Sequence, residues 1–254
     1  MRASHEFEGR SFALGPFIKS PVPQTIEVVA HAGFDFAVAD MEHTPLDPQG
    51  LYPMLLAAER HDLDLIVRLP ARDEIFFKWV LDLGVRNVQV PFVETAADAR
   101  DAVRLSRFAP EGERGLCRFV RSAGYSSVPR SQYLAEANNS TRLILQIESA
   151  NAVSNIAEIA AVPGIDTIFI GPYDLSQSLG VPGQIWDQTV VDAMERVIDV
   201  CRSRGVNLGT FTDSVEGVEY WARAGASLIE YGSDYDLMLR GSASLRTPFT
   251  PHGP

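Results

Sequence analysis

Lysine is scarce in this sequence. Among 254 residues only Lys19 and Lys78 are lysines. An enzyme that works through a Schiff base needs a lysine in its pocket. Lys78 lies within a predicted helix, 73–83, where it faces away from the interior of the fold. Lys19 is therefore the one lysine that could serve such a mechanism.

Cysteine is equally scarce, and basic residues form no block. Cys117 and Cys201 lie far apart without the spacing of a metal site, so we expect buried or idle thiols. The 22 Lys and Arg against 33 Asp and Glu give 22 − 33 = −11. An acidic chain without a basic block is a poor nucleic-acid binder, so we expect no nucleic-acid partner.

Long apolar runs are also missing. No run approaches the length of a membrane span, and residues 1–6 lack the pattern of a signal peptide. We therefore expect a cytoplasmic protein without a membrane partner. The hydrophobic fraction of 46% is nevertheless ample for a core.

Short apolar runs alternate with helical patterns along the whole chain. Strands are predicted at 12–18, 35–40, 63–68, 85–93, 143–148, 168–174, 206–211 and 227–231. Helices are predicted at 23–32, 51–61, 73–83, 96–108, 132–138, 151–162, 175–179, 188–204, 215–224 and 235–245. Eight strands that alternate with helices are typical of a single α/β domain, the (β/α)8 TIM barrel. We expect this one domain to span 1–254, with a short C-terminal tail at 247–254.

The alternation lapses at about 109–131, which we interpret as an arginine-containing insertion. Loops of this length inside a compact domain are usually functional or contact a partner. Its arginines are expected to form a solvated face, with an anion site or a subunit contact as the alternatives.

Polar residues collect where the predicted strands end. The active sites of such barrels are built from residues just past each strand, and those positions carry Asp40, Glu42, His43, Arg68, Glu94, Gln146, Glu148, Asp174 and Asp234. Glu148 and Asp174 offer hard oxygen ligands that suit Mg²⁺ or Mn²⁺. In the simpler interpretation, Glu148 only starts a turn and Asp174 only caps a helix. A single His beside a turn is more often structural, but His43 shares its predicted rim with an arginine and two carboxylates, which favours a functional role.

Several motifs, in order and with consistent spacing, point to a known family. They are Gly33 to Asp35, Asp40-Met41-Glu42-His43, Val67 to Pro70, Leu81 to Gly84, Val90-Pro91, Gly112 to Gly115, Gln146-Ile147-Glu148, Phe169 to Ser176 and Leu179-Gly180. Through them the chain resembles the metal-dependent (class II) pyruvate aldolases of the HpcH/HpaI type. These include 4-hydroxy-2-oxoheptanedioate and 2-dehydro-3-deoxyglucarate aldolases. The resemblance implies an aldehyde-lyase that cleaves a 4-hydroxy-2-oxo acid reversibly into pyruvate and an aldehyde.

The resemblance also implies where the metal and the 2-oxo acid bind. It assigns Glu148 and Asp174 to a divalent metal ion, Mg²⁺, Mn²⁺ or Co²⁺, which the carboxylate and keto oxygens of the substrate also contact. It places Arg68 at the keto oxygen and Gln146 beside the metal ligands. A metal and an arginine at a developing enolate agree with the chemistry of retro-aldol cleavage.

The proton transfer and the carboxylate site are implied in the same way. His43, through a metal-associated water, would take the proton from the C4 hydroxyl. Asp40 is the near candidate to orient its imidazole, and Asp82 is the family-like one, acting from a neighbouring subunit. The turn at Gly171, Pro172 and Tyr173 resembles the carboxylate-binding turn of the family.

The sequence departs from the typical aldolase pattern in two places, and the family resemblance also suggests an oligomeric state. Thr44 and the segment 116–125 differ from the typical aldolase pattern, and both could line the aldehyde side of the pocket. Related barrels are homo-oligomers, often hexamers, so we expect a homo-oligomer with contacts through 109–130 and the last helix.

Four alternatives stay open. The first is a citrate-synthase-like condensation of oxaloacetate with acetyl-CoA on the same scaffold, which the family also includes. The second is a Schiff-base lyase that uses Lys19, and the third is a metal-holding barrel without catalysis. The fourth is an additional phosphate site at 209–212, of a kind common in barrels.

Overall fold

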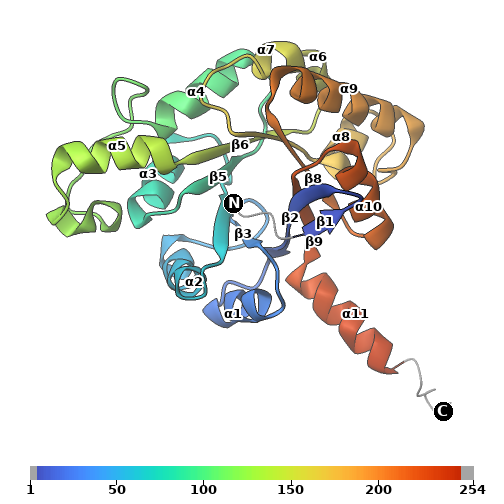
Figure 1. Ribbon diagram of the computed structural model, residues 1–254, viewed down its shortest axis with the longest axis horizontal. Coiled ribbons are helices and arrows are strands. Elements are labelled where there is room, and N and C mark those ends of the chain that lie inside the picture. The colour runs from blue at the N-terminus through green and yellow to red at the C-terminus, as the bar shows by residue number, and fades with distance from the viewer. Residues whose placement is uncertain (1–4, 247–254) are drawn as a thin grey trace.

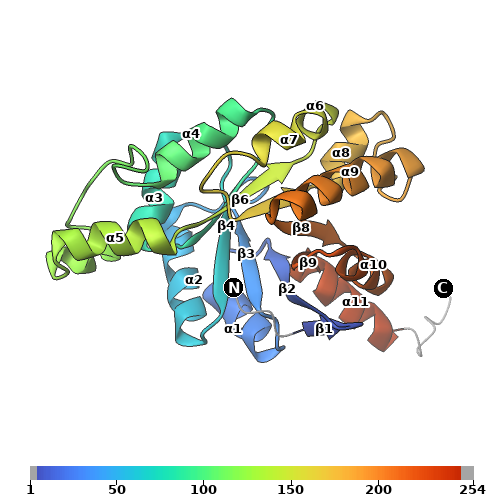
Figure 2. The same cartoon turned by 45° about the horizontal axis from the view of Figure 1, so that its top comes forward.

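The computed structural model describes residues 5–246. Eight parallel strands form one closed barrel with helices around it (Figures 1 and 2). The strands are β2 (Arg10–Ile18), β3 (Phe36–Asp40), β4 (Asp64–Arg68), β5 (Asn87–Val90), β6 (Arg142–Ile147), β7 (Thr167–Ile170), β8 (Asn207–Thr212) and β9 (Leu228–Ser233). Each pairs with the next, and β9 pairs with β2 to close the ring. The predicted (β/α)8 barrel is confirmed.

The helices follow the strands in the predicted alternation. They are α1 (Pro23–His31), α2 (Pro48–Arg60), α3 (Glu74–Leu83), α4 (Ala96–Ser106), α5 (Arg130–Ser140), α8 (Pro172–Ser178), α9 (Gln188–Arg204), α10 (Val215–Ala224) and α11 (Asp234–Arg246). Among residues 5–246 no helix has the length and apolar character that a membrane span requires. The predicted tail, 247–254, lies outside the described residues.

Three local features differ from the predictions. The strand predicted at 168–174 ends at Ile170, and α8 already begins at Pro172, so Asp174 lies in a helix. The helix expected at 151–162 is broken at Asn155 into α6 (Ala150–Ser154) and α7 (Ile156–Ile159). At the break the Asn155 side chain donates to the backbone carbonyl of Glu94, 3.0 Å away. A short strand, β1 (His5–Phe7), also pairs antiparallel with β2, and the sequence pattern did not reveal it.

The insertion contains the 3₁₀ helix η1 (Arg121–Ser126) and leads into α5. The expectation of a solvated arginine face is wrong for Arg114, which is buried, bonds to Asp82 at 2.8 Å and lies over the Phe108 ring. Arg121 pairs with Glu59. These two arginines therefore fasten the insertion to the barrel wall.

Two apolar cores hold the barrel together. The larger core lies between the strands and the helices, and the smaller fills the barrel interior, with Phe36, Ile66, Ile144 and Phe169 among its members. Gly15 allows β2 to approach β3, because a Cβ at this position would lie 2.1 Å from the Phe36 carbonyl oxygen. A filled interior leaves the ends of the strands as the place for a ligand site.

Candidate active site

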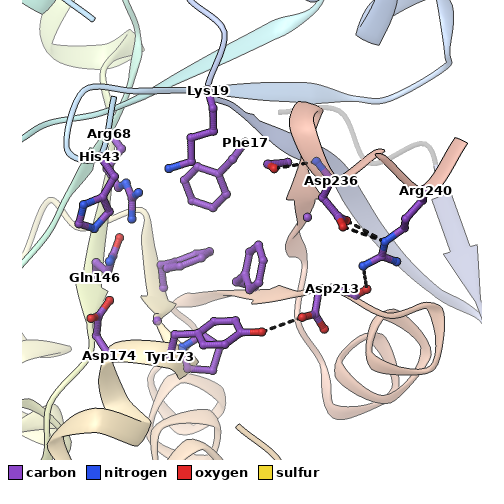
Figure 3. Close-up of a pocket in the computed structure, with 16 residues that line it drawn as sticks. Phe17, Lys19, His43, Arg68, Gln146, Tyr173, Asp174, Asp213, Asp236 and Arg240 are labelled. Atoms are coloured by element: carbon purple, nitrogen blue, oxygen red, sulfur yellow. Dashed lines mark hydrogen bonds and ion pairs between the residues drawn. The ribbon is translucent and has the colours of Figure 1, made fainter. Parts of the chain in front are cut away.

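A cavity of about 430 Å³ opens at the carboxyl ends of the strands. Figure 3 shows the side chains that line it, with His43, Arg68, Gln146 and Asp174 along one side and Tyr173, Asp213 and Arg240 along another. Of the residues that the sequence placed past different strands, His43, Arg68, Gln146 and Asp174 line this cavity, whereas Asp40 and Glu148 are buried beside it.

The Arg68 guanidinium is clamped at the floor of this cavity. Arg68 Nε and NH2 donate to the two carboxylate oxygens of Asp40, at 2.9 and 2.8 Å, and NH1 lies 2.9 Å from Glu42 Oε2. Its carbon Cζ also lies 4.6 Å from the centre of the Phe17 ring. Burial by itself would lower the pKa of Arg68, but the bonds and charge of Asp40, followed by Glu42, raise it. The cation is fixed and permanently charged.

Lys19 supplies a second cation beside the first. Its Nζ forms a short ion pair with Asp40 Oδ2. Its backbone N–H donates to Asp234 at 2.8 Å, and the N–H of Ser20 donates to the same carboxylate at 3.0 Å. Although burial raises the pKa of Asp40, its bonds to Arg68 and Lys19 dominate and lower that pKa to about 2.

Three further carboxylates, those of Glu42, Glu148 and Asp174, lie close enough to one another for their charges to interact. Glu148 accepts hydrogen bonds from the Phe92 backbone N–H at 2.8 Å and from Gln146 Nε2. Burial raises the pKa of Glu148 to about 7, and the charges of Glu42 and Asp174 add to that rise. Burial likewise raises the pKa of Glu42, with Asp174 contributing and Arg68 opposing. This group repels itself and is suited to an additional cation.

Glu148 and Asp174 fit a divalent ion that keeps open coordination positions. Within residues 5–246 no three or more His, Cys, Asp and Glu side chains are arranged to hold a metal ion. Mg²⁺ is commonly bound by one or two carboxylates, with water and substrate completing the shell. Two converging carboxylates and a site accessible to substrate match that pattern.

His43 lies at the mouth of the cavity with an exposed side chain. The expectation that Asp40 orients its imidazole is not met, because both oxygens of Asp40 are held by Arg68 and Lys19. Asp40 Oδ1 instead accepts from the backbone N–H of His43, at 3.4 Å. The carboxylate beside His43 Nε2 is that of Glu42, at 3.9 Å.

Asp82 lies away from the cavity within the same chain. It bonds to Arg114 and borders a separate hollow that Tyr52, Trp79 and Tyr125 also line. Any contact with a His43 would therefore have to come from another copy of the chain.

The simpler interpretation of Asp174 as a helix cap does not fit the structure. Gly171 is the N-cap of α8 and makes no side-chain cap bond, while Asp174 lies in the first turn and lines the cavity. A Cβ at Gly171 would lie 3.2 Å from Glu148 Oε2. The missing side chain therefore lets the Glu148 carboxylate lie against the start of α8, the helix that carries Asp174.

An aromatic wall faces the polar side, and only Tyr173 of its members was anticipated. Phe211 lies between Phe17 and Tyr173, with ring centres 5.9 and 5.8 Å away. The Tyr173 hydroxyl donates to Asp213 at 2.7 Å, and burial together with this bond raises the pKa of Tyr173 to about 12. Phe17 and Phe211 lie near the carboxyl ends of β2 and β8, and this position in the sequence was the signal that could have identified them as lining residues.

Other expectations fail on placement. Neither Thr44 nor the segment 116–125 lines the cavity of the single chain. At 209–212 the hydroxyl groups of Thr210 and Thr212 are buried, and that of Thr210 donates to the Ile170 carbonyl, which gives no support to a phosphate site. Cys201 is buried as expected, whereas Cys117 is exposed.

A (β/α)8 barrel with a clamped arginine and several carboxylates at the carboxyl ends of its strands has the general layout of an enzyme whose active site lies at that face. A family model described as HpcH/HpaI aldolase/citrate lyase matches residues 14–240. The chain belongs to this family, and it is a carbon–carbon lyase.

Individual relatives agree with this assignment. The 2-dehydro-3,6-dideoxy-6-sulfogluconate aldolase of Pseudomonas putida is 36% identical over 91% of this chain and 89% of its own. A solved HpcH/HpaI family structure from Burkholderia cenocepacia J2315 has a TM-score of 0.90 and 36% identity, with 95% of each chain covered. The crystal structure of citrate synthase SbnG has a TM-score of 0.85 and 33% identity, with 93% of each chain covered.

Proposed function

We propose that this lyase is a divalent-metal-dependent aldolase that cleaves a 4-hydroxy-2-oxo acid reversibly into pyruvate and an aldehyde. Glu148 and Asp174 would hold the ion, Mg²⁺, Mn²⁺ or Co²⁺. The observation that carries the proposal is a clamped Arg68 on the same side of the cavity as Asp174, whose charge interacts with that of the buried Glu148. A fixed donor such as Arg68 would stabilise charge at the keto oxygen of a 2-oxo acid, and a cation held by Glu148 and Asp174 would supply Lewis-acid chemistry beside it.

Arg68 acts on the charge that develops during cleavage. Breaking the bond between C3 and C4 leaves a pyruvate enolate, and a bound divalent ion supplies Lewis-acid stabilisation to its oxygen. Asp40 uses two of the five guanidinium N–H groups. The remaining donors of Arg68 can point at the keto oxygen, and because the cation is already fixed, little reorganisation is needed.

His43 is the base in this proposal. It would take the proton from the C4 hydroxyl, which starts the cleavage, and return it when the aldol bond is formed. Its exposed position at the mouth of the cavity leaves room for the substrate hydroxyl. Glu42, or Asp82 from another copy of the chain, would orient the imidazole.

Two regions of the cavity would contact the two ends of the substrate. The turn at Gly171, Pro172 and Tyr173 borders the carboxylates, and we assign the substrate carboxylate to it. Gln146 is buried beside Glu148 and donates to it. The aromatic wall of Phe17, Phe211 and Tyr173 would then receive the aldehyde portion.

The assembly and the location are part of the proposal as well. Helix α11 extends away from the barrel (Figure 1). It has no buried residue, and Met238, Leu239 and Leu245 are exposed. Such an apolar helix face suits burial in a homo-oligomer, of which a hexamer is the form we expect. The cytoplasmic location stays a prediction.

One alternative chemistry keeps an observation in its favour. The likeness to a citrate synthase structure supports a condensation of oxaloacetate with acetyl-CoA. A Schiff base on Lys19 is weakened, because its Nζ is engaged in an ion pair with Asp40, whereas a Schiff-base lysine must present a free amine to the substrate.

The test is pyruvate release from racemic 4-hydroxy-2-oxoheptanedioate by metal-stripped protein, with and without Mg²⁺, Mn²⁺ or Co²⁺. Activity that returns with the metal and is absent in Glu148→Ala supports the aldolase. Activity that ignores the metal, together with borohydride trapping of pyruvate, would transfer the chemistry to Lys19. Release of free thiol from acetyl-CoA with oxaloacetate, without pyruvate release, would favour the condensation.

A further inference from the structure

Lys19 lines the cavity, and the proposed function gives it no role. Its position is fixed from the start of α11, because its backbone N–H donates to Asp234 at 2.8 Å and its carbonyl oxygen accepts from the Tyr235 hydroxyl at 3.2 Å. Figure 3 shows the side chain directed toward the side of the cavity on which Arg68 and His43 lie. A firmly held backbone therefore carries a cation into the site.

The ammonium group of Lys19 is the immediate neighbour of the Arg68 guanidinium. Asp40 Oδ2 pairs with Lys19 Nζ and also accepts from Arg68 NH2, at 2.8 Å. Both cations lie beside the Phe17 ring, with Lys19 Nζ 5.4 Å and Arg68 Cζ 4.6 Å from the ring centre. Two cations that share one oxygen and one ring must contact neighbouring parts of a bound substrate.

Most of the hydrogen-bond donors of this ammonium group are unused. An ammonium group has three N–H donors, and within residues 5–246 the Asp40 carboxylate is the only acceptor bonded to Lys19 Nζ. Glu42 and Glu230, a fully buried carboxyl group on β9, interact with Lys19 through their charges. Because Lys19 lines the cavity, its two remaining donors are available to a ligand there.

The substrate class of the proposed function offers a matching acceptor. A 4-hydroxy-2-oxo acid carries a keto oxygen on C2 and a hydroxyl oxygen on C4, two carbon atoms along the chain. When Arg68 holds the first oxygen, its neighbour Lys19 is within reach of the second. Phe17 also belongs to the aromatic wall that we assign to the aldehyde portion. Lys19 therefore lies where the pyruvate half of the substrate meets the aldehyde half.

We propose that Lys19 is a catalytic residue of this aldolase, and that its ammonium group donates a hydrogen bond to the oxygen on C4. The proposal rests on the proposed function. It differs from a Schiff-base role, because the lysine forms no covalent bond with the substrate and keeps its protons throughout the reaction.

The hydrogen bond acts on the oxygen where charge develops on the aldehyde side. In cleavage His43 removes the hydroxyl proton, and the electron pair left on the C4 oxygen forms the aldehyde carbonyl as the bond between C3 and C4 breaks. The electrons of that bond pass to the pyruvate enolate beside Arg68. In condensation Lys19 polarises the aldehyde carbonyl, the enolate carbon attacks it, and His43 returns the proton to the oxygen. A charge-assisted hydrogen bond to this oxygen lowers the barrier in both directions.

A partial reaction separates this role from a merely structural one. Exchange of the methyl protons of pyruvate with solvent needs the enolate but involves no C4 oxygen. The exchange therefore depends on Arg68 and not on the donor of Lys19. If Lys19 only held Asp40 and Arg68 in place, its loss would slow the exchange and the aldol reaction to the same extent.

The test compares four variants of the full chain, each supplied with Mg²⁺, Mn²⁺ or Co²⁺. Lys19→Met removes the cation at similar length, Lys19→Gln leaves a neutral donor, and Arg68→Lys alters the group at the enolate. Lys78→Met is the matched control, because it replaces the only other lysine, which is exposed on α3 and pairs with Glu74. Proton NMR in D₂O measures the exchange. Cleavage of racemic 4-hydroxy-2-oxoheptanedioate and condensation of pyruvate with glycolaldehyde measure the aldol reaction.

The proposal expects a selective loss. Lys19→Met should lower kcat for the aldol reaction by about 100-fold or more, the usual cost of removing one donor at a developing oxyanion, while the exchange keeps nearly its wild-type rate. Lys19→Gln should lose less, and again only in the aldol reaction. Arg68→Lys should slow both reactions, and Lys78→Met should match the wild type in both.

Two results would overturn the proposal while leaving the proposed function intact. One is an aldol rate that is the same in wild type and Lys19→Met, and the other is an equal proportional loss of exchange and aldol reaction in that variant. If Lys19→Met does not fold, the same comparison in Lys19→Gln decides the question. A wild-type protein that fails to exchange pyruvate, or that exchanges it but catalyses neither aldol reaction, would refute the proposed function and this proposal together.

Discussion

Replacing Glu230 by Gln should change how the stability of the protein depends on pH. The carboxyl group has an ordinary pKa of 4.5, and burial raises its pKa in the folded protein to about 8. Below 4.5 the group is protonated in both states and contributes no pH dependence. Between the two values the unfolded chain releases the proton and the folded one retains it, so the wild-type free energy of unfolding falls as pH rises. Above about 8 both states are ionised and the fall ends.

The size of the effect follows from that interval. Each pH unit is worth about 1.4 kcal/mol, so the stability of Glu230→Gln relative to wild type should rise by about 5 kcal/mol from acid to alkaline pH. The pKa of Glu148 is also raised, but this group is present in both proteins and cancels in the difference. Denaturant unfolding of the metal-stripped proteins at a series of pH values gives the curve.

Glu158→Gln is a matched control, because Glu158 is exposed on α7. The free energy of unfolding of Glu158→Gln should differ little from that of the wild type, and the difference should be almost independent of pH. A flat difference curve for Glu230→Gln would mean that Glu230 has an ordinary pKa and is ionised in the folded protein. That result would refute the reasoning from burial.

Three further predictions concern the cavity. Arg68→Lys should lower kcat/KM for aldol cleavage by about 100-fold or more, because a lysine cannot reproduce the two-point bond to Asp40 or its fixed donors; a smaller loss in steady-state assays would argue against a role at the enolate. Asp174→Asn should weaken Mn²⁺ binding in calorimetry. Glu94→Gln is the control and should leave Mn²⁺ binding unchanged, because the Glu94 carboxylate is bound by Ser149 and Asn151 outside the cavity. Equal losses of affinity in the two variants would contradict the metal assignment. Gly171→Ala should lower kcat with little change in Tm, because the Cβ of the alanine would lie 3.2 Å from a carboxylate oxygen of Glu148. An unchanged kcat would show that catalysis does not depend on the present position of the Glu148 carboxylate.

The fold could be predicted because periodicity and topology agree along the chain. The helices at 188–204 and 215–224 have the predicted limits, since their apolar stripes and flanking caps are local signals. The break at Asn155 was not predictable, because it involves a contact with Glu94, 61 positions away. The strand at 5–7 is too short to show a period.

The positions of the site residues were predictable, whereas their partners were not. Parallel strands end on one rim, so Arg68, Glu148 and Asp174 had to lie near each other. Which carboxylate binds Arg68 depends on side-chain reach across neighbouring strands, and Asp40 lies directly beside Arg68 in the β3–β4 register. This pairing, which removes Asp40 from His43, cannot be read from spacing along the chain.

Glu230 and Gln89 were missed although the sequence carried a signal. Strands of a parallel sheet are covered on both faces and are normally continuous apolar runs. A glutamate in the middle of 227–231 and a glutamine in the middle of 85–93 depart from that rule. Such residues either face a ligand or bond to other polar groups inside the barrel, and only the structure shows that both side chains are fully buried.

The measurement that tests the central claim most directly is hydrogen exchange at the methyl group of pyruvate. An aldolase that forms a pyruvate enolate must also protonate it, so the reverse step should exchange the methyl protons in D₂O even when the aldehyde partner is unknown. The account predicts that proton NMR detects this exchange with Mg²⁺, that a chelator stops it, and that Arg68→Lys or Asp174→Asn slows it strongly. Pyruvate that keeps its methyl protons in the presence of the wild-type protein and each of the three metals would contradict the account.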